Sequence, residues 1–384
     1  MYKRTLALQS HPLALKYNLK YYWKRTAARS MAKDIFCRTR PLQTPKGPSP
    51  NYRRISMIIE KVLKKLTPER IKLEVSMTQR VELPVNLEKW VREYEKIGKR
   101  DDFFWKFIYK LNLKVNLFGV SGLHKSDELK FLMTMYIILV DDIVDKKQDK
   151  NLLEAFLKIN GSRQDKLIFK SFKTPQKEGL EFTSKLLGYM QEKIKKLPGY
   201  KSFYELLRYD ISQTLNAMNY AFLINKNPYL INKVEHWLYS PHTLQGMINC
   251  TLDLMCFSRF HFKQLGKIRE IFWNAQKMAR ISNCLATWER EVNEKDVTSS
   301  VFVYAVDRQL LSIKDFSGTR GKRDQLIARI GHSSISKELL KEWENCHHAI
   351  SLHKRTEGTN VKEFLVAMEE ILLMHLSVKK EYNQ

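Results

Sequence analysis

The chain has 384 residues, 43% of them hydrophobic, which is enough to bury a sizeable core in one large domain or two small ones. Five cysteines without a CxxC pair argue against a disulfide framework and a zinc finger. The net charge of +26 fits partners or substrates that carry phosphate, and no apolar run approaches the ~20 residues of a membrane span.

The N-terminal residues 1–54 form a basic extension ahead of a domain that we assign to residues 55–384. The extension holds 13 Lys or Arg residues and a single acid, Asp34. An Arg-rich, acid-poor segment is typical of organellar transit peptides. A disordered basic tail or a helical arm folded over the domain would have the same composition. We therefore expect a cytoplasmic protein, with organellar targeting by this segment as the alternative.

The rest of the chain predicts an all-α fold, because apolar residues recur at helical spacing and strand alternation is not evident. Residues 67–85 are the exception and are expected to be irregular or β-like. An aromatic-rich helix is predicted over 87–115, a second over 127–145, and a loop with one short helix over 146–174. The further helices are expected at 55–66, 178–195, 202–225, 233–262 (interrupted at 240–243), 273–292, 301–313, 323–333, 336–351 and 360–379.

An acidic cluster ends the helix predicted over 127–145. Asp141 and Asp145 are four residues apart on one helix face, next to Asp142. Like charges at this spacing repel, and the helix dipole also disfavours acids at a C-terminus. A cation would relieve both effects, and Mg²⁺ prefers carboxylate, phosphate and water oxygens. The alternative is surface charge that the following lysines neutralise.

A second polar set lies on the helix predicted over 273–292. Asn283, Thr287 and Glu291 are spaced i, i+4, i+8, so they drift about 80° around the helix and span about 12 Å along it. All three carry hard oxygen ligands suited to Mg²⁺. Arg280 and Arg290 are near enough to contact phosphate oxygens. A solvated polar stripe is the alternative interpretation of this set alone.

Together the two sets resemble the signatures of class I terpene synthases. Residues 141–145, Asp-Asp-Ile-Val-Asp, match the aspartate-rich motif in full. Residues 283–291 match the second metal motif, Asn-Asp-x-x-Ser/Thr-x-x-x-Glu, at its three ligand positions. The resemblance covers about residues 85–380 and is to the bacterial-type, single α-domain cyclases. The basic tail and lysine-rich composition further resemble their eukaryotic relatives, such as octocoral cyclases.

The chain departs from this family at three points. Cys284 replaces an acid that is not a metal ligand, and the Arg-Tyr pair common near the family's C-terminus is absent. The arginine that senses diphosphate on the kinked helix is also missing from the stretch around Pro241. His242 or Lys233 is a candidate substitute, and Arg280 and Arg290 are the alternative diphosphate contacts.

The resemblance implies a class I terpenoid synthase helical bundle around a central active-site cavity. It implies a terpene cyclase that ionises a linear prenyl diphosphate with three Mg²⁺ ions, or Mn²⁺ in their place, and yields a terpene hydrocarbon or alcohol. Asp141, Asp142, Asp145, Asn283, Thr287 and Glu291 would hold the metal. Geranylgeranyl diphosphate is slightly preferred over farnesyl diphosphate.

An apolar cavity for the carbocation is also implied. We expect Tyr136 in its wall, with Phe104, Trp105, Phe222 and Trp273 as further candidates that core packing explains equally well. The protein would be a monomer or homodimer without a nucleic-acid partner. The rival functions are a chain-elongating prenyl transferase and, in a different class, a basic helical protein that binds nucleic acid or acts as a scaffold.

Overall fold

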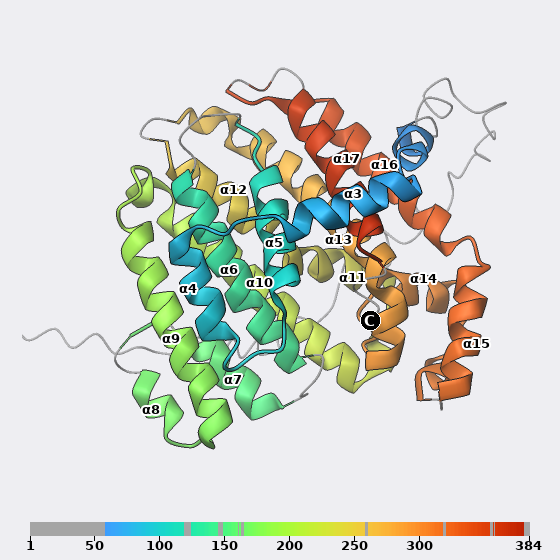
Figure 1. Ribbon diagram of the computed structural model, residues 1–384, viewed down its shortest axis with the longest axis horizontal. Coiled ribbons are helices and arrows are strands. Elements are labelled where there is room, and N and C mark those ends of the chain that lie inside the picture. Colours follow the sequence, from blue (N-terminus) through green and yellow to red (C-terminus); the bar gives the residue numbers. More distant parts are fainter. Residues whose placement is uncertain are drawn as a thin grey trace, which may run out of the picture. The chain divides into compact units, whose positions relative to one another are not determined.

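The computed structural model describes residues 58–379 except 119–123, 145–148, 160, 163–164, 258–259, 318–319, 354–355 and 357. These residues belong to one compact unit, Pro50–Gln384, and their regular structure is entirely helical (Figure 1). The predicted all-α class is therefore confirmed for the part of the chain that the structure describes. The basic extension 1–54 and Asp145 lie outside these residues.

The helices follow one another with short connections, and residues 58–64 are also helical. The α-helices are α3 (Pro68–Gln79), α4 (Val85–Tyr94), α5 (Asp102–Lys114), α6 (His124–Asp142), α7 (Lys150–Lys158), α8 (Asp165–Phe169), α9 (Thr174–Ile194), α10 (Tyr200–Lys226), α11 (Lys233–Tyr239), α12 (Gly246–Met255), α13 (Leu265–Glu294), α14 (Ser300–Asp307), α15 (Arg320–Gly331), α16 (Ile335–Ser351) and α17 (Val361–Ser377). The 3₁₀ helices are η2 (Pro228–Leu230), η3 (Ser240–Leu244), η4 (Phe262–Gln264) and η5 (Ile313–Ser317).

The long helix α13 organises the bundle, because α12, α14, α15, α16, α17 and η3 all pack against it. Every residue of α12 is buried, so this helix runs through the core. α12 and α13 approach closely at Gly246, where a Cβ atom would lie 2.5 Å from the Cβ of Gln276. A larger residue there would push the two helices apart.

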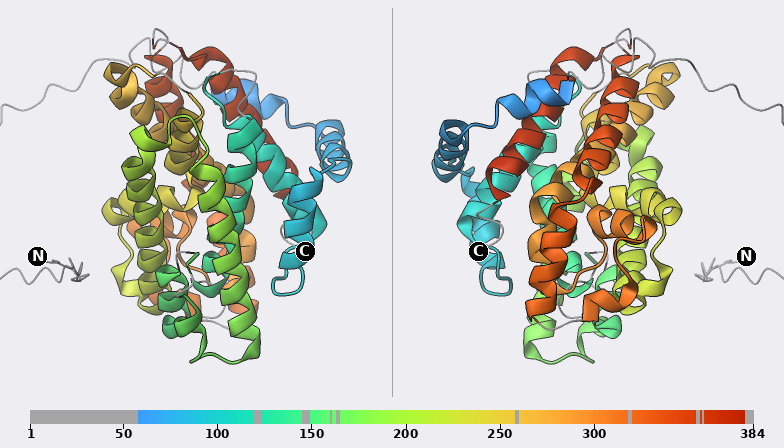
Figure 2. Two further views of the ribbon diagram at one scale, coloured as in Figure 1. Left: turned by 90° about the vertical axis from the view of Figure 1, so that its left-hand side faces the viewer. Right: turned by 90° about the vertical axis from the view of Figure 1, so that its right-hand side faces the viewer.

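Helix α6 is enclosed by α4, α5, α9 and α12. The long helices run alongside one another in the two side views, and α3 lies against α17 (Figure 2). A buried ion pair joins α6 to α12, with Lys130 Nζ 2.6 Å from Asp253 Oδ1 and both side chains inaccessible to solvent. This pair fixes α6, which carries the acidic motif, against the core.

Residues 67–85 were expected to be irregular or β-like, and this expectation is wrong because α3 lies there. Thr67 caps the helix, with its Oγ1 accepting a hydrogen bond from the Arg70 backbone N–H at 3.2 Å, and Pro68 begins it. α3 is held largely by charged contacts: Lys110 of α5 pairs with Glu74, and Arg70 pairs with Glu370 of α17. A helix held in this way has no apolar stripe to reveal it.

The single helix expected over 87–115 is also wrong, because the chain leaves α4 after Tyr94 and begins α5 at Asp102. The Asp101 side chain accepts a hydrogen bond from the Phe104 backbone N–H at 2.8 Å and so caps α5. Gly98 permits the turn, since a Cβ there would lie 2.1 Å from the Tyr94 ring. Among the described residues, no helix combines the length and apolar character needed to cross a bilayer.

Candidate active site

The acidic motif begins in the last turn of α6, which continues into a π-helical turn at Ile143 and Val144. Asp141 lines a cavity in the described part of the chain. Asp142 points elsewhere: its Oδ1 lies 2.8 Å from Arg100 Nη2, and its Oδ2 accepts a 3.5 Å hydrogen bond from the Tyr94 hydroxyl. Asp142 is therefore not part of the cavity wall, but its partner Arg100 is.

The second motif faces the same cavity from α13. Asn283, Thr287 and Glu291 all line it, as their spacing predicts. Thr287 Oγ1 lies 2.9 Å from the Asn283 carbonyl oxygen and 2.6 Å from Glu291 Oε1, so its proton can serve either acceptor. Glu291 is only 5% exposed, and its Oε2 is buried without a hydrogen-bond partner among the described residues.

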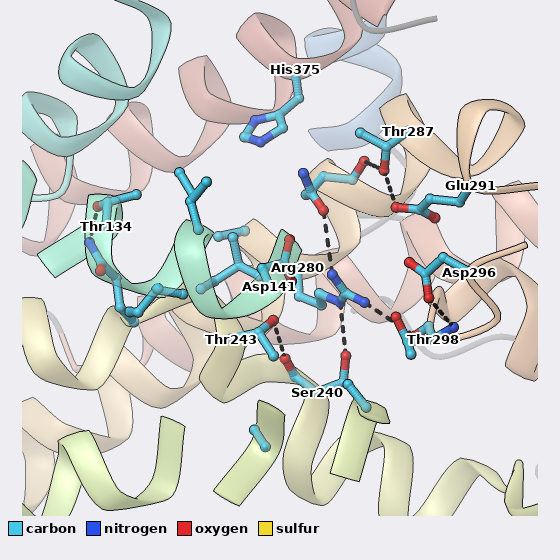
Figure 3. Close-up of a pocket in the computed structure, with 18 of the residues that line it drawn as sticks. Thr134, Asp141, Ser240, Thr243, Arg280, Thr287, Glu291, Asp296, Thr298 and His375 are labelled. Atoms are coloured by element: carbon cyan, nitrogen blue, oxygen red, sulfur yellow. Dashed lines mark hydrogen bonds between the residues drawn. The ribbon is translucent and has the colours of Figure 1, made fainter. Parts of the chain in front are cut away.

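The cavity has a volume of about 210 Å³ and lies between α5, α6, α10, η3 and α13. Figure 3 shows Asp141, Arg280, Thr287, Glu291 and Asp296 around it. Its remaining wall is largely apolar. The residues of that wall include Phe104, Ile108, Leu111, Val115, Ile137, Ile138, Ala217, Ala221, Ile224, Leu244 and Val303.

Three guanidinium groups line the cavity beside its carboxylates: those of Arg100, Arg280 and Arg290. Arg280 is buried at 8% exposure and is held from three sides. Its Nε donates to Ser240 Oγ at 2.8 Å, its Nη2 donates to the Thr298 carbonyl at 3.1 Å, and its Nη1 lies 3.5 Å from Asn283 Oδ1. Arg280 therefore connects the kinked segment η3 with the second motif.

An unusual helix end brings one more acid into the cavity. Lys295 caps α13 in the left-handed conformation with a φ of 60°, and the Asp296 backbone N–H then donates to the Glu291 carbonyl at 3.0 Å. The chain folds back, so that buried Asp296 and half-buried Thr298 line the cavity. Lysine is unusual here, because glycine usually occupies a left-handed position at a helix end.

Burial and crowding perturb the carboxyl groups of both motifs. Desolvation, followed by the charge of Asp142, raises the pKa of Asp141 to about 6. Desolvation, followed by the charge of Asp296, raises the pKa of Glu291 to about 7. Such a set of crowded, desolvated carboxylates would be stabilised by a cation.

Two buried histidines in the cavity wall have lowered pKa values, in contrast to the raised pKa values of the carboxyl groups. Desolvation, followed by the charge of Arg280, lowers the pKa of His236 to about 3, and desolvation lowers that of His375 to about 4. His236 Nε2 contacts Ser300 Oγ at 2.8 Å, and His375 Nδ1 donates to the Ile371 carbonyl at 3.0 Å. Both imidazoles are therefore neutral at neutral pH.

Several residues that the sequence singled out are not in the cavity wall. Lys233 Nζ lies 3.4 Å from Asp307 Oδ2 and 4.2 Å from the centre of the Tyr304 ring. His242 packs against Trp273, with 5.0 Å between ring centres. The structure therefore gives neither Lys233 nor His242 a place at the cavity where diphosphate would bind.

Of the aromatic candidates, only Phe104 lines the cavity. Tyr136 is buried, with its hydroxyl 3.3 Å from the Phe156 carbonyl oxygen, and Trp105 and Phe222 are buried in the core. Tyr220 is an aromatic wall residue that sequence reasoning missed. Its position on α10 offered no signal, because this helix carries both buried aromatic residues, such as Phe203 and Phe222, and exposed ones, such as Tyr204 and Tyr209.

The donor set fits a hard divalent cation. Asn283, Thr287 and Glu291 offer an amide, a hydroxyl and a carboxylate oxygen, and the unpartnered Glu291 Oε2 needs a positive or donor group. No group of three or more His, Cys, Asp or Glu side chains in the described residues is arranged to hold a metal by itself. The second motif contributes one carboxylate only, and Asp145 is outside the described residues.

Comparison with known proteins supports the fold. No protein-family model matches the sequence, and no curated protein does. Among solved structures, isoprene synthase from grey poplar leaves (Populus x canescens), in complex with three Mg²⁺ ions and dimethylallyl-S-thiolodiphosphate, matches with a TM-score of 0.51 and 12% identity. The match covers 81% of this chain and 54% of that chain, so this chain spans about half the length of its neighbour.

The likeness at this level of identity concerns the fold. The closer resemblance to bacterial-type or octocoral cyclases stays a prediction. The described part of this chain has the all-α terpene synthase fold.

Proposed function

We propose that the protein is a Mg²⁺-dependent terpene cyclase that ionises a linear prenyl diphosphate and releases diphosphate. One observation carries the proposal: Asp141 of α6 and the Asn283, Thr287 and Glu291 set of α13 line the same cavity. These residues come from motifs about 140 positions apart in the printed sequence. Chance surface acids would have no reason to meet in one buried site.

The chain's own groups suit the parts of such a substrate. Arg280 and Arg290 line the cavity beside the second motif and can bind diphosphate oxygens through charge-assisted hydrogen bonds. The apolar wall suits the prenyl chain, and the rings of Phe104 and Tyr220 can stabilise a cation through their faces. Closure of the cavity over a bound substrate would limit access of bulk water to that cation.

Asn283, Thr287, Glu291 and Asp141, with Asp145 from the part of the motif outside the described residues, would hold the metal. When bound, three Mg²⁺ ions, or Mn²⁺ ions, supply Lewis acidity that neutralises the leaving diphosphate. Asp142 contributes indirectly, because its ion pair with Arg100 orients the end of α6. The three Mg²⁺ ions and the allylic thiolodiphosphate named for the poplar enzyme support this assignment.

The size of the cavity bears on the substrate. Its volume of about 210 Å³ is below the roughly 300–1,000 Å³ usual for drug-sized ligands. The preference for geranylgeranyl over farnesyl diphosphate gains no support from this volume, and the shorter chain is the first substrate to test.

The rival functions have less support. A chain-elongating prenyl transferase carries a second aspartate-rich motif, and here Asn283, Thr287 and Glu291 replace it. The charge of +26 remains the argument for a nucleic-acid-binding protein. That function gives no reason for buried carboxylates around an apolar cavity.

The test is incubation with Mg²⁺ and prenyl diphosphates of five to twenty-five carbons, followed by gas chromatography. Asp141→Ala and Asn283→Ala should each abolish product while circular dichroism shows a retained fold. Asn274→Ala is the matched control, because Asn274 is a half-buried residue of α13 that is not part of the cavity wall, and its amide donates to the Glu270 carbonyl. A folded wild-type protein that yields no terpene from any substrate would refute the proposed function.

A further inference from the structure

A cluster of amide and hydroxyl groups interrupts the apolar wall of the cavity. Asn112 of α5, Thr134 of α6, and Gln245 and Asn249 at the start of α12 all line it. Thr134 precedes Asp141 by seven residues on α6, which places the cluster about 10 Å along the helix from the acidic motif. It therefore faces the part of the cavity where the hydrocarbon chain would lie.

Hydrogen bonds fix the orientation of the Gln245 amide. Thr134 Oγ1 donates its single proton to the Lys130 carbonyl at 2.9 Å, so it can only accept from its other neighbours. Gln245 Nε2 donates to Thr134 Oγ1 and, at 3.1 Å, to the Lys130 carbonyl. The reverse orientation would set the amide oxygen against a carbonyl oxygen. Gln245 Oε1 is therefore the atom turned away from this network.

Two acceptor atoms in the cluster remain without partners. Gln245 Oε1 and Asn249 Oδ1 are both buried and have no hydrogen-bond partner among the described residues. The two side chains are 4% and 3% exposed, and both line the same cavity. An unsatisfied buried acceptor destabilises the protein, so both oxygens call for a donor.

A prenyl chain has no hydrogen-bond donor, whereas one water molecule can donate one hydrogen bond to each amide oxygen. Its lone pairs would then be free to face the hydrocarbon. This arrangement presents a nucleophile to a cation, in contrast to the exclusion of bulk water from such a cavity. The strained backbone of Gln245, with a φ of 49°, holds this residue at the break between η3 and α12.

On the basis of the proposed cyclase function, we infer that Gln245 and Asn249 hold a water molecule that captures the carbocation, so that the product is a terpene alcohol. The diphosphate leaves with the electron pair of its C–O bond, and the water oxygen forms a new C–O bond to the cation. The excess proton passes to a diphosphate oxygen. The sum is prenyl diphosphate plus water giving terpene alcohol plus hydrogen diphosphate, without an oxidant or a reductant.

The experiment incubates the full chain with Mg²⁺ and farnesyl or geranylgeranyl diphosphate in H₂¹⁸O, followed by gas chromatography and mass spectrometry. The expected main product is an alcohol that carries ¹⁸O. Asn249→Leu and Gln245→Met each remove one water-binding oxygen. Each should lower the alcohol-to-hydrocarbon ratio about tenfold, as the loss of one hydrogen bond implies. The use of two variants keeps the test decisive if one of them does not fold.

Thr183→Val is the matched control. The Thr183 hydroxyl is also buried and donates to the Gly179 carbonyl at 2.9 Å, but Thr183 lies on α9 and is not part of the cavity wall, so its removal should leave the product ratio unchanged. A wild-type enzyme that makes only hydrocarbons, an alcohol without ¹⁸O, or an unchanged ratio in a folded Asn249→Leu or Gln245→Met variant would each overturn the inference and leave the cyclase function standing. Absence of any terpene from the folded wild type would overturn the proposed function itself.

Discussion

His375 should make the stability of the protein fall as the pH is lowered from 7 to 5. It is 3% exposed on α17, and burial lowers its pKa to about 4, against an ordinary value of about 6.5 for an unfolded chain. Between these two values the unfolded chain binds the proton and the folded chain does not. Protonation therefore favours unfolding in this window, and stability rises with pH through it.

The magnitude follows from the two pKa values. At pH 5 protonation favours the unfolded chain by about 2 kcal/mol through His375, and at pH 7 by about 0.2 kcal/mol. His375→Leu should remove this difference, so that the variant loses about 1.8 kcal/mol less free energy of unfolding than the wild type between pH 7 and pH 5. Buried His236 contributes equally to both proteins and cancels from the comparison.

Urea unfolding followed by circular dichroism at pH 7 and pH 5 measures these four free energies. His332→Leu is the matched control, because His332 Nδ1 also donates to the carbonyl four residues earlier, at 2.7 Å, but its ring is exposed, directly after the end of α15. The control should lose as much stability as the wild type. An equal pH dependence for His375→Leu and the wild type would refute the claim that His375 is buried and neutral.

Three further predictions concern the site and the core. Glu291→Gln should raise the free energy of unfolding, measured in chelator at pH 8, by up to about 3 kcal/mol, because a carboxyl group with its pKa raised to about 7 destabilises the folded protein when it is ionised. The same substitution should abolish turnover. An unchanged midpoint of urea unfolding would contradict the prediction. Arg280→Lys should keep the positive charge but lose the hydrogen bonds of the guanidinium group to Ser240 and the Thr298 carbonyl, so kcat/KM should fall roughly 10- to 200-fold. A smaller loss in steady-state kinetics would contradict a role of Arg280 in binding diphosphate. Lys130→Met should lower the free energy of unfolding by about 3–5 kcal/mol, because it leaves the Asp253 carboxylate buried and unpaired. The double variant with Asp253→Leu should recover most of that loss in urea unfolding. A single variant as stable as the wild type would contradict the prediction.

The sequence alone determined the fold class and the two motifs. Helical periodicity does not depend on distant contacts, so the all-α class could be predicted, and so could the common face of Asn283, Thr287 and Glu291. The prediction from periodicity was wrong at α3, where ion pairs replace the apolar stripe. It was also wrong at residues 95–101, where Gly98 and the Asp101 cap interrupt the expected helix. α3 depends on neighbours that are remote in the chain, and residues 95–101 form a turn that has no helical periodicity.

The composition of the cavity was decided by tertiary structure. The break after α4 brings Arg100 to Asp142, and the left-handed turn at Lys295 brings Asp296 to the second motif. The partner that each side chain meets depends on how one helix end packs against another helix, which local sequence does not encode. The sequence identified Phe104 among its candidate wall residues, but it could not distinguish it from Trp105, because both are aromatic and one residue of rotation about α5 decides which one faces the cavity.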